Sequence, residues 1–171
     1  TTDIICVVLV TKIILPSRRA ELLTRHRLLN ALTDLMDRRL IIIAAPAGYG
    51  KTSLLIDFSH QVEWPVCWYA LDPLDQDLFR FAAYLISALQ VRFPDFGSSA
   101  LQTLENLSQE QPNLDLLVAA IVNDAYEHIN EHFILVLDDF HLVDSSKPVN
   151  QFINRFLQDM DENCHVITAS R

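Results

Sequence analysis

The sequence is poor in cysteine, in positive charge and in glycine, and each shortage excludes a class of protein. Its three cysteines, Cys6, Cys67 and Cys164, are odd in number, far apart and without C-x-x-C spacing, which argues against a disulfide framework and a zinc site. A reducing, cytoplasmic compartment is therefore expected. Lysine and arginine total 13 against 22 aspartates and glutamates, a formal net charge of -9. Without a broad basic surface to neutralise nucleic-acid phosphates, direct DNA contact by this chain is not expected.

Long apolar runs are also missing. The run from Ile4 to Val10 is far shorter than the ~20 residues that a membrane-spanning helix needs. We expect no membrane contact, and we interpret this run as an extended segment or a truncated sheet edge, with a lost membrane anchor as the remaining alternative. Residues 1–10 are accordingly predicted to be an N-terminal extension of unassigned role.

Helical and extended patterns alternate along the rest of the chain. Apolar residues at helical spacing predict helices over 20–36 and 51–58, from Phe79 to Leu89, from Pro112 to Ile129, and around 149–157. Short apolar runs predict strands over 40–44, 66–71, 133–137 and 165–169, while 97–111 has no clear pattern. This alternation indicates an α/β fold with three layers and a mainly parallel sheet. In such sheets ligands bind beyond the carboxyl ends of the strands.

A phosphate-binding loop stands between the first predicted strand and the helix that follows it. Its sequence is Ala45-Pro46-Ala47-Gly48-Tyr49-Gly50-Lys51-Thr52, which matches G-x-x-x-x-G-K-S/T except that Ala45 replaces the first glycine. Glycine lets the main chain approach phosphate closely, main-chain N–H groups at a helix start bind the anion, and Lys51 would reach the β and γ oxygens. Thr52 would offer its hydroxyl to Mg²⁺, and Ser53 would lie near the α-phosphate.

Two of only three glycines in the chain fall inside this loop, in the strand–loop–helix context that the motif requires. The alternative is an ordinary turn between a strand and a helix. The context favours the phosphate-binding interpretation, and it predicts ATP with Mg²⁺ as the ligand.

Paired acids follow the strand predicted over 133–137. Asp138 is expected to hold the magnesium, usually through water. Asp139 would orient or deprotonate the attacking water, and we expect slow hydrolysis because aspartate is one methylene shorter than the glutamate often used there. The alternative is that the pair only caps a strand and begins a turn.

Arg171 ends the last predicted strand. A cation at this position would contact the γ-phosphate and report its loss, or it would be a frayed end of the chain, and the residues alone leave both open. Asp72 and Asp75 are interpreted as turn and helix-cap residues rather than metal ligands.

Further segments carry a family resemblance. They are Thr11-Lys12, Pro16, Arg25-His26-Arg27-Leu28-Leu29, Trp68-Tyr69-Ala70-Leu71-Asp72 with Asp75, Arg80-Phe81, Tyr84-Leu85-Ile86 and Leu137-Asp138-Asp139-Phe140-His141-Leu142. Together with the P-loop they resemble the ATPase domain of the large ATP-binding LuxR-family regulators of the maltose-activator type. These regulators belong to the STAND class of signal-transduction ATPases. The similarity runs from about Thr11 to Arg171.

The resemblance implies a P-loop NTPase fold with an ASCE-type strand order, incomplete at the C-terminus, over residues 11–171. It implies a bacterial transcription activator in which ADP holds a resting monomer, ATP with an inducer favours self-association, and hydrolysis resets the switch. The stretch Arg25 to Leu28 would lie near the adenine, and Arg171 would be the phosphate sensor. Inducer-sensing helical repeats and a helix-turn-helix would be further domains of the longer protein, so inducer recognition and DNA binding would not belong to this segment.

Three functions are compatible with these residues. The leading hypothesis is a regulatory ATPase whose output is conformational. The second is a P-loop kinase or phosphotransferase that passes the γ-phosphate to a small substrate, for which 97–111 is the candidate lid. The third is a scaffold that binds nucleotide without turning it over.

Overall fold

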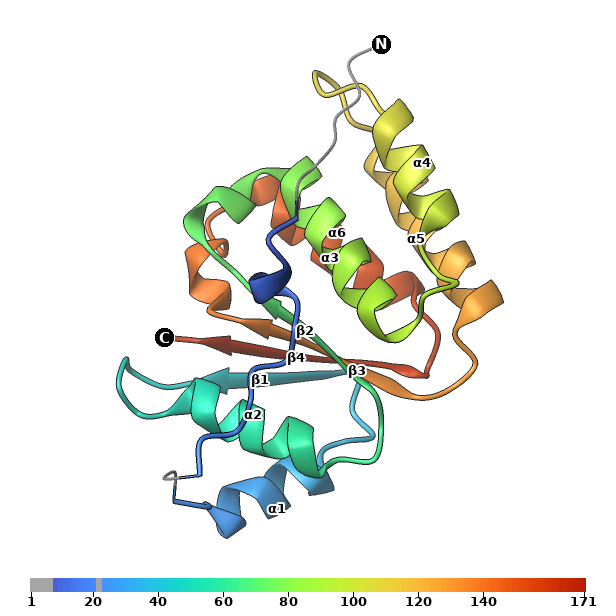
Figure 1. The fold of residues 1–171 in the computed structure, drawn as a ribbon. Helices are drawn as coiled ribbons and strands as arrows, with labels where there is room; N and C mark the ends of the chain where they lie inside the picture. The colour runs from blue at the N-terminus through green and yellow to red at the C-terminus, as the bar shows by residue number, and fades with distance from the viewer. Residues whose placement is uncertain (1–7, 21–22) are drawn as a thin grey trace.

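Four parallel strands form the centre of the structure, and helices cover both faces of the sheet (Figure 1). A computed structural model describes residues 8–20 and 23–171. The strands are β1 (Leu40–Ala44), β2 (Val66–Ala70), β3 (Phe133–Asp138) and β4 (Cys164–Ser170). Each coincides within a residue or two with a predicted strand, because a strand buried on both faces reads as a continuous apolar run.

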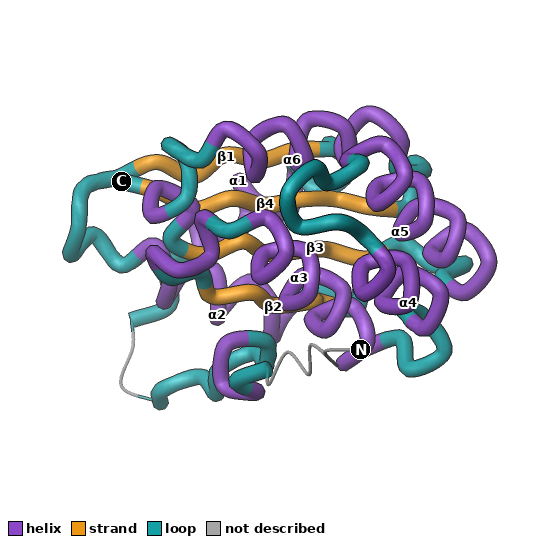
Figure 2. The backbone as a smooth tube through the Cα atoms, turned by 90° about the horizontal axis from the view of Figure 1, so that it is seen from above, coloured by secondary structure: helices purple, strands orange, loops and turns teal. Residues whose placement is uncertain are grey.

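The strand order is β1-β4-β3-β2, as Figure 2 shows from above. All three neighbouring pairs are parallel, and Ala44 pairs with Ser170 while Leu137 pairs with Thr168. β4 therefore lies between the strand that precedes the P-loop and the strand that carries the acid pair, which is the order implied by the resemblance. The carboxyl ends of β1, β4 and β3 meet at one edge of the sheet. The expected α/β fold with a parallel sheet is confirmed.

Helices form two unequal layers. α1 and α2 lie on one face, and α3 to α6 lie on the other (Figure 1). The helices are α1 (His26–Asp34), α2 (Lys51–Gln61), α3 (Leu78–Arg92), α4 (Ser98–Asn106), α5 (Leu114–His128) and α6 (Lys147–Asp159). Three short 3-10 turns complete the described part of the chain: η1 (Val10–Lys12), η2 (Pro73–Gln76) and η3 (Phe140–Leu142).

The sheet separates two apolar clusters. Alternate residues of the strands point to opposite faces, so Trp68 and Val136 pack with Phe58 of α2, while Tyr69 and Leu137 pack in the larger cluster under α3, α5 and α6. Fully burying a side chain of this size stabilises the fold by about 1.5–3 kcal/mol relative to leaving it exposed. None of the described helices has both the length and the apolar character needed to cross a membrane.

The cysteines that the structure describes are not cross-linked. Cys67 and Cys164 are free and buried on β2 and β4, and Cys6 lies outside the described residues. Burial raises the pKa of the Cys164 thiol to about 12 and raises that of Cys67 as well. Both thiols are therefore packing groups rather than nucleophiles.

The helix predicted over 20–36 is shorter than expected. α1 begins at His26 and ends at Asp34, Ala20 lies in a turn, and residues 21–22 are outside the described part. Leu23 is 88% exposed, so this member of the apolar pattern does not face the core. Arg25, the residue before the helix, has a non-helical main chain and bonds through its side chain to the P-loop. A tertiary contact thus overrides the leucine pattern.

The structure differs from the predicted pattern at two further places, the start of α5 and the stretch 97–111. Pro112 does not open the next helix: α5 begins at Leu114, and Asn113 caps it by accepting a hydrogen bond from the Leu116 N–H. The unpatterned stretch 97–111 contains α4. Its first turn is capped by the buried carboxylate of Asp124, which accepts from the N–H groups of Gly97 and Ala100 at 3.1 and 3.0 Å. The cap comes from α5, so no local sequence signal announces α4.

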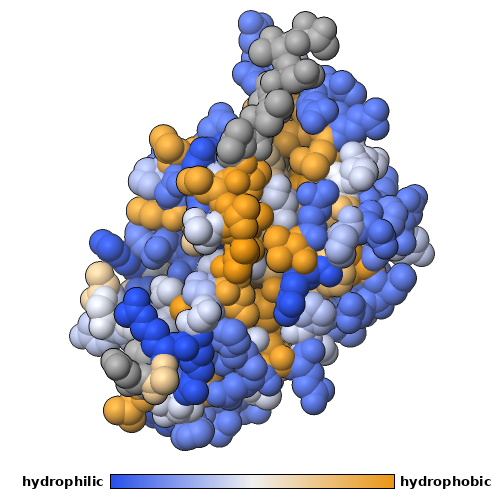
Figure 3. Space-filling view, in the orientation of Figure 1, coloured by the Kyte–Doolittle hydropathy of each residue, from blue (hydrophilic) through white to orange (hydrophobic). Residues whose placement is uncertain are grey.

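Residues 8–15, here named the strap, cross the edge of the sheet at β2. The described part of the run Ile4 to Val10 is Val8 to Val10, and Val10 already belongs to η1; residues 4–7 lie outside the described part. Figure 3 shows an apolar band along the course that the strap takes in Figure 1. Leu9, Val10 and Ile14 contribute to the exposed apolar surface.

Lys12 attaches the strap to the carboxyl end of β2. Its Nζ donates to Asp72 at 2.7 Å and to Asp75 at 2.6 Å, and it lies 4.3 Å from the centre of the Tyr84 ring. Arg80 donates to the other carboxylate oxygen of Asp75 at 3.0 Å. Asp72 and Asp75 cap η2 as predicted, but with Lys12 and Arg80 they also form an ion cluster around the buried Asp75 carboxylate. Sequence reasoning missed this cluster, because Lys12 is 60 residues from Asp72.

We predict that Asp75→Asn destabilises the fold strongly. The Asp75 side chain is fully buried, so removing its charge leaves Lys12 and Arg80 with only the partly exposed Asp72 as a carboxylate partner, at a cost of about 3–5 kcal/mol. Urea denaturation measures this loss. Asp95→Asn, at an exposed position, is the matched control and should change the free energy of unfolding by less than about 0.5 kcal/mol. Equal effects of the two variants would show that the cluster is not stabilising.

Candidate nucleotide-binding site

The P-loop connects the end of β1 to the start of α2. Gly48 and Gly50 both have left-handed main chains, with φ of 86° and 75°. Other residues adopt this conformation at a cost, which explains why two of the three glycines stand here. At Gly48 a Cβ would meet nothing within 4 Å, so the main-chain conformation and not space is what favours glycine. Turns of this kind direct neighbouring N–H groups toward one side, where an anion can bind.

Lys51 lies at the first position of α2 and folds back over the loop. Its Nζ donates to the carbonyl oxygen of Ala45 and, at 3.3 Å, to that of Pro46. The ammonium group is therefore held against the P-loop rather than extended into solvent. Ser53 is half-buried in the same helical turn, whereas Tyr49 is 69% exposed.

Asp138 is the last residue of β3, and its side chain is almost completely buried. Its carboxylate accepts a hydrogen bond from the Thr52 hydroxyl at 2.9 Å and from the Asp139 N–H at 3.1 Å. Thr52 thus reaches from α2 to β3, although β4 lies between β1 and β3. The hydroxyl and carboxylate that sequence reasoning assigned to magnesium are brought together.

Burial raises the pKa of Asp138, because a charged carboxylate is poorly solvated at this position. The neighbouring charge of Asp139 raises it further, while the hydrogen bond from Thr52 and the charge of Lys51 lower it without cancelling the effect of burial. Bound Mg²⁺ would favour the charged form. Within the described residues no three His, Cys, Asp or Glu side chains are grouped as metal ligands. Mg²⁺ is commonly held by one or two protein groups together with phosphates and water, and the Thr52–Asp138 pair suits that mode.

Asp139 has a left-handed main chain, with φ of 59° and ψ of 40°. It is the only non-glycine residue with positive φ in the part of the chain that the structure describes. Asp tolerates this conformation better than most residues, and such strain occurs often at functional sites. The turn places Asp139 immediately beyond the buried Asp138 carboxylate. Its role toward water stays a prediction.

Arg171 leaves the sheet beside the first residue of the P-loop. Ser170 pairs with Ala44, and its carbonyl accepts from the Ala45 N–H at 3.2 Å. Arg171 is exposed. Its role as a phosphate sensor stays a prediction.

Arg25 contacts the P-loop from outside. Its two terminal nitrogens donate to the carbonyl oxygens of Tyr49, at 3.0 Å, and Gly50, at 2.6 Å. Only the family resemblance pointed to Arg25, and it pointed to the adenine. No sequence pattern could reveal bonds to residues 24 and 25 positions away.

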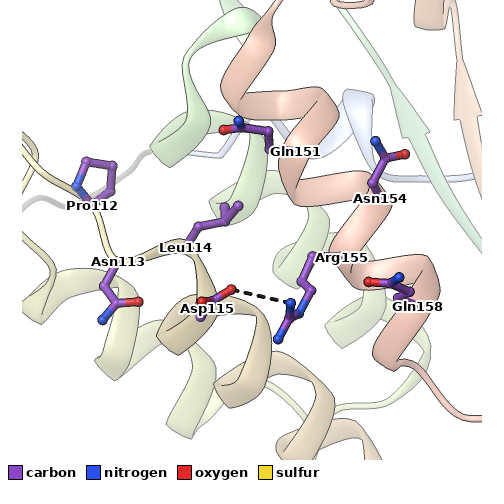
Figure 4. A pocket seen from close by; sticks show the side chains of 8 residues that line it. All are labelled: Pro112, Asn113, Leu114, Asp115, Gln151, Asn154, Arg155 and Gln158. Carbon is purple, nitrogen blue, oxygen red and sulfur yellow. Dashed lines mark ion pairs between the residues drawn. The ribbon is translucent and has the colours of Figure 1, made fainter.

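The surface groove drawn in Figure 4 is a different site. It has a volume of about 550 Å³ and lies between the start of α5 and the face of α6. Asp115 and Arg155 face each other across it, 3.8 Å apart. None of the P-loop residues, and neither acid of the pair, lines this groove.

We predict that Asp138→Asn stabilises the ligand-free protein. Because the folded pKa of Asp138 is raised, its contribution to stability is present at low pH and is lost as pH rises through that pKa. Asparagine removes the buried charge at neutral pH and can still accept from Thr52. We expect the melting temperature to rise by roughly 2–4 °C at neutral pH, the size of a 1 kcal/mol gain in a chain of this length. The gain should shrink near pH 3, where the wild-type carboxyl is protonated; a gain of equal size at both pH values would contradict this explanation.

Comparison with known proteins supports a relationship over almost the whole chain. No protein-family model matches this chain. It is 32% identical over 164 residues to the HTH-type transcriptional regulator MalT of Yersinia pestis (strain Pestoides F), and 30% identical over 161 residues to MalT of Vibrio parahaemolyticus serotype O3:K6. Each match covers 94% of this chain and 17% of the relative, so the chain spans about one sixth of their length.

A solved structure shares the fold. A chain in the structure of Drosophila ORC bound to AT-rich DNA and Cdc6 matches 85% of this chain and 45% of its own length, with a TM-score of 0.54 and 12% identity. At this identity the match concerns the fold alone. Over 94% of its length, the chain is a homologue of one part of the HTH-type transcriptional regulators named MalT.

Proposed function

We propose that residues 11–171 are a P-loop ATPase domain that serves as the nucleotide switch of a longer transcription regulator. The observation that carries this proposal is the Thr52–Asp138 hydrogen bond of 2.9 Å. It joins the helix that follows the P-loop to the strand that ends in the acid pair. This is the combination of groups that Mg²⁺–ATP requires.

The main chain of residues 45–52 would bind the phosphates through N–H groups, with Lys51 beside the β and γ oxygens and Ser53 near the α-phosphate. Thr52 and Asp138 would hold Mg²⁺. ATP, when bound with Mg²⁺, supplies a transferable γ-phosphoryl group. Residues that contact the γ-phosphate would distinguish bound ATP from bound ADP. We propose that Arg171 is one of them.

Turnover in this proposal is slow. Asp139 would orient or deprotonate the attacking water, and its short side chain together with its restrained turn would hold it far from an ideal position. Slow hydrolysis suits a switch, because the ATP state then lasts long enough to act. Hydrolysis to ADP would reset it.

The relatives are much longer than this chain, which supports the proposal that it works with further domains. Because the chain spans 17% of them, we propose that it works with further domains of a longer cytoplasmic regulator, including inducer-sensing repeats and a helix-turn-helix, and that the ATP state favours self-association. Direct contact with DNA is assigned to other domains, since this chain carries a net charge of -9.

The position of α4 favours the switch over a phosphotransferase. A phosphotransferase of this class needs a lid that closes over the acceptor, and 97–111 was the candidate. That stretch instead forms α4, which packs against α3 and α5 on the side of the molecule away from the β1–α2 turn (Figure 1). It also has no Arg or Lys to clamp phosphates.

We predict different defects for two site variants in calorimetric titrations with ATP. Lys51→Ala should weaken binding roughly 10–100-fold, because it removes charge-assisted hydrogen bonds to phosphate. Asp138→Ala should retain binding in EDTA but lose most of the gain in affinity that Mg²⁺ provides. Lys147→Ala, at an exposed position on α6, is the matched control and should bind like wild type. If Lys51→Ala and Asp138→Ala also bind like wild type, the site is assigned wrongly.

ATP labelled at the γ-phosphate distinguishes the three functions. We expect label to appear slowly as inorganic phosphate and in no other product. A labelled small-molecule acceptor would indicate a phosphotransferase. Binding without any release of phosphate would indicate a scaffold. Asp139→Ala should then change neither the affinity for ATP nor the amount of phosphate released.

A further inference from the structure

Two cations bind main-chain carbonyls of the P-loop. Lys51 binds the carbonyl oxygens of Ala45 and Pro46 at the start of the loop, and Arg25 binds those of Tyr49 and Gly50 at its end. Four main-chain carbonyls near the phosphate site thus have side-chain donors. The two cations differ in origin, because Lys51 belongs to the motif and Arg25 precedes α1.

Carbonyl direction determines N–H direction in this loop. A peptide unit is planar and trans, so its carbonyl and its N–H point to opposite sides. A carbonyl that turned toward a bound phosphate would repel it and would remove an N–H donor at the same time. Donors that hold the carbonyls outward therefore keep the neighbouring N–H groups available to an anion.

Arg25 is itself firmly placed. Its carbonyl oxygen accepts from the N–H groups of Leu28 and Leu29 at 3.1 and 3.0 Å, which fixes it to the first turn of α1. The Gly50 carbonyl accepts from the Leu54 N–H at 3.0 Å, which places it at the first turn of α2. The Arg25 side chain therefore joins the starts of two helices that lie side by side on one face of the sheet (Figure 1).

Gly50 provides the space for this contact. A Cβ at this position would lie 3.0 and 3.2 Å from the two terminal nitrogens of Arg25. The guanidinium thus rests directly against the main chain of the loop, and its planar fork spans two successive carbonyls. Lysine could donate to both carbonyls only from a single nitrogen, without the planar fork of two separate nitrogens.

We infer that Arg25 is a positioning residue of the phosphate site: it orients the P-loop by binding the Tyr49 and Gly50 carbonyls from outside. This inference rests on the proposed nucleotide site. The inference differs from a role at the adenine in one consequence. If Arg25 positions the loop, it supports the binding of phosphate groups whether or not a base is attached.

The test compares ATP with inorganic tripolyphosphate, which has the phosphates but no base. In titrations of the same protein, Arg25→Ala should weaken both ligands by a similar factor, roughly 10-fold. Arg25→Lys preserves the charge but not the fork, and it should keep most of the defect for both ligands. Arg38→Ala, at an exposed arginine between α1 and β1, is the matched control and should bind both like wild type. Melting temperatures identify any variant that fails to fold, and the conservative Arg25→Lys variant then carries the test.

Three results would overturn the inference. A defect for ATP alone would place Arg25 at the base or sugar. Full recovery in Arg25→Lys would reduce its role to simple charge attraction. Wild-type binding by Arg25→Ala would show that the two hydrogen bonds do not matter. The proposed function fails separately if wild type binds neither ligand or if Lys51→Ala binds both normally, and the inference then falls with it.

Discussion

The candidate site depends on a buried carboxylate that the protein holds at the end of a central strand. Asp138 is 4% exposed, and burial raises its pKa, so in the ligand-free protein its charge weakens the fold. The hydrogen bond from Thr52 offsets part of this cost and at the same time fixes the distance between α2 and β3. A divalent cation would offset much more of it. Stability and the proposed binding of Mg²⁺ with nucleotide would therefore make opposite demands on one residue, as is common where a site is assembled before its ligand arrives.

Hydrogen bonds connect several elements around this carboxylate. Lys51 and Arg25 restrain the P-loop carbonyls, the left-handed turn at Asp139 follows the carboxylate directly, and Ser170 hydrogen-bonds the loop from β4. If a bound nucleotide lost its γ-phosphate, the resulting change in position would be transmitted between elements that already contact one another. Such a network is a suitable basis for a two-state response, because tightly packed groups change arrangement together rather than gradually.

Much of this site could be predicted from the sequence because its signals are local. The P-loop requires glycines at left-handed positions, and Gly48 and Gly50 adopt that conformation. Asp138 follows a run of apolar residues, and the structure places it at the end of a strand buried on both faces. The capping roles of Asp72 and Asp75 also follow from short-range hydrogen bonds. Where the pattern failed, the deciding contact was distant: Arg25 turns toward the P-loop before α1 begins, and Asp124 caps α4 from another helix.

The sequence by itself determined the α/β alternation, the P-loop motif and the acid pair, since each depends on residues within a few positions of one another. Only the tertiary structure decided that Thr52 bonds directly to Asp138 and that Arg25 binds the carbonyls of the P-loop. It also decided that Lys12 ties the strap to the end of β2. These contacts join residues from 24 to 86 positions apart, and their energy comes from burial and geometry that exist only after the layers have packed.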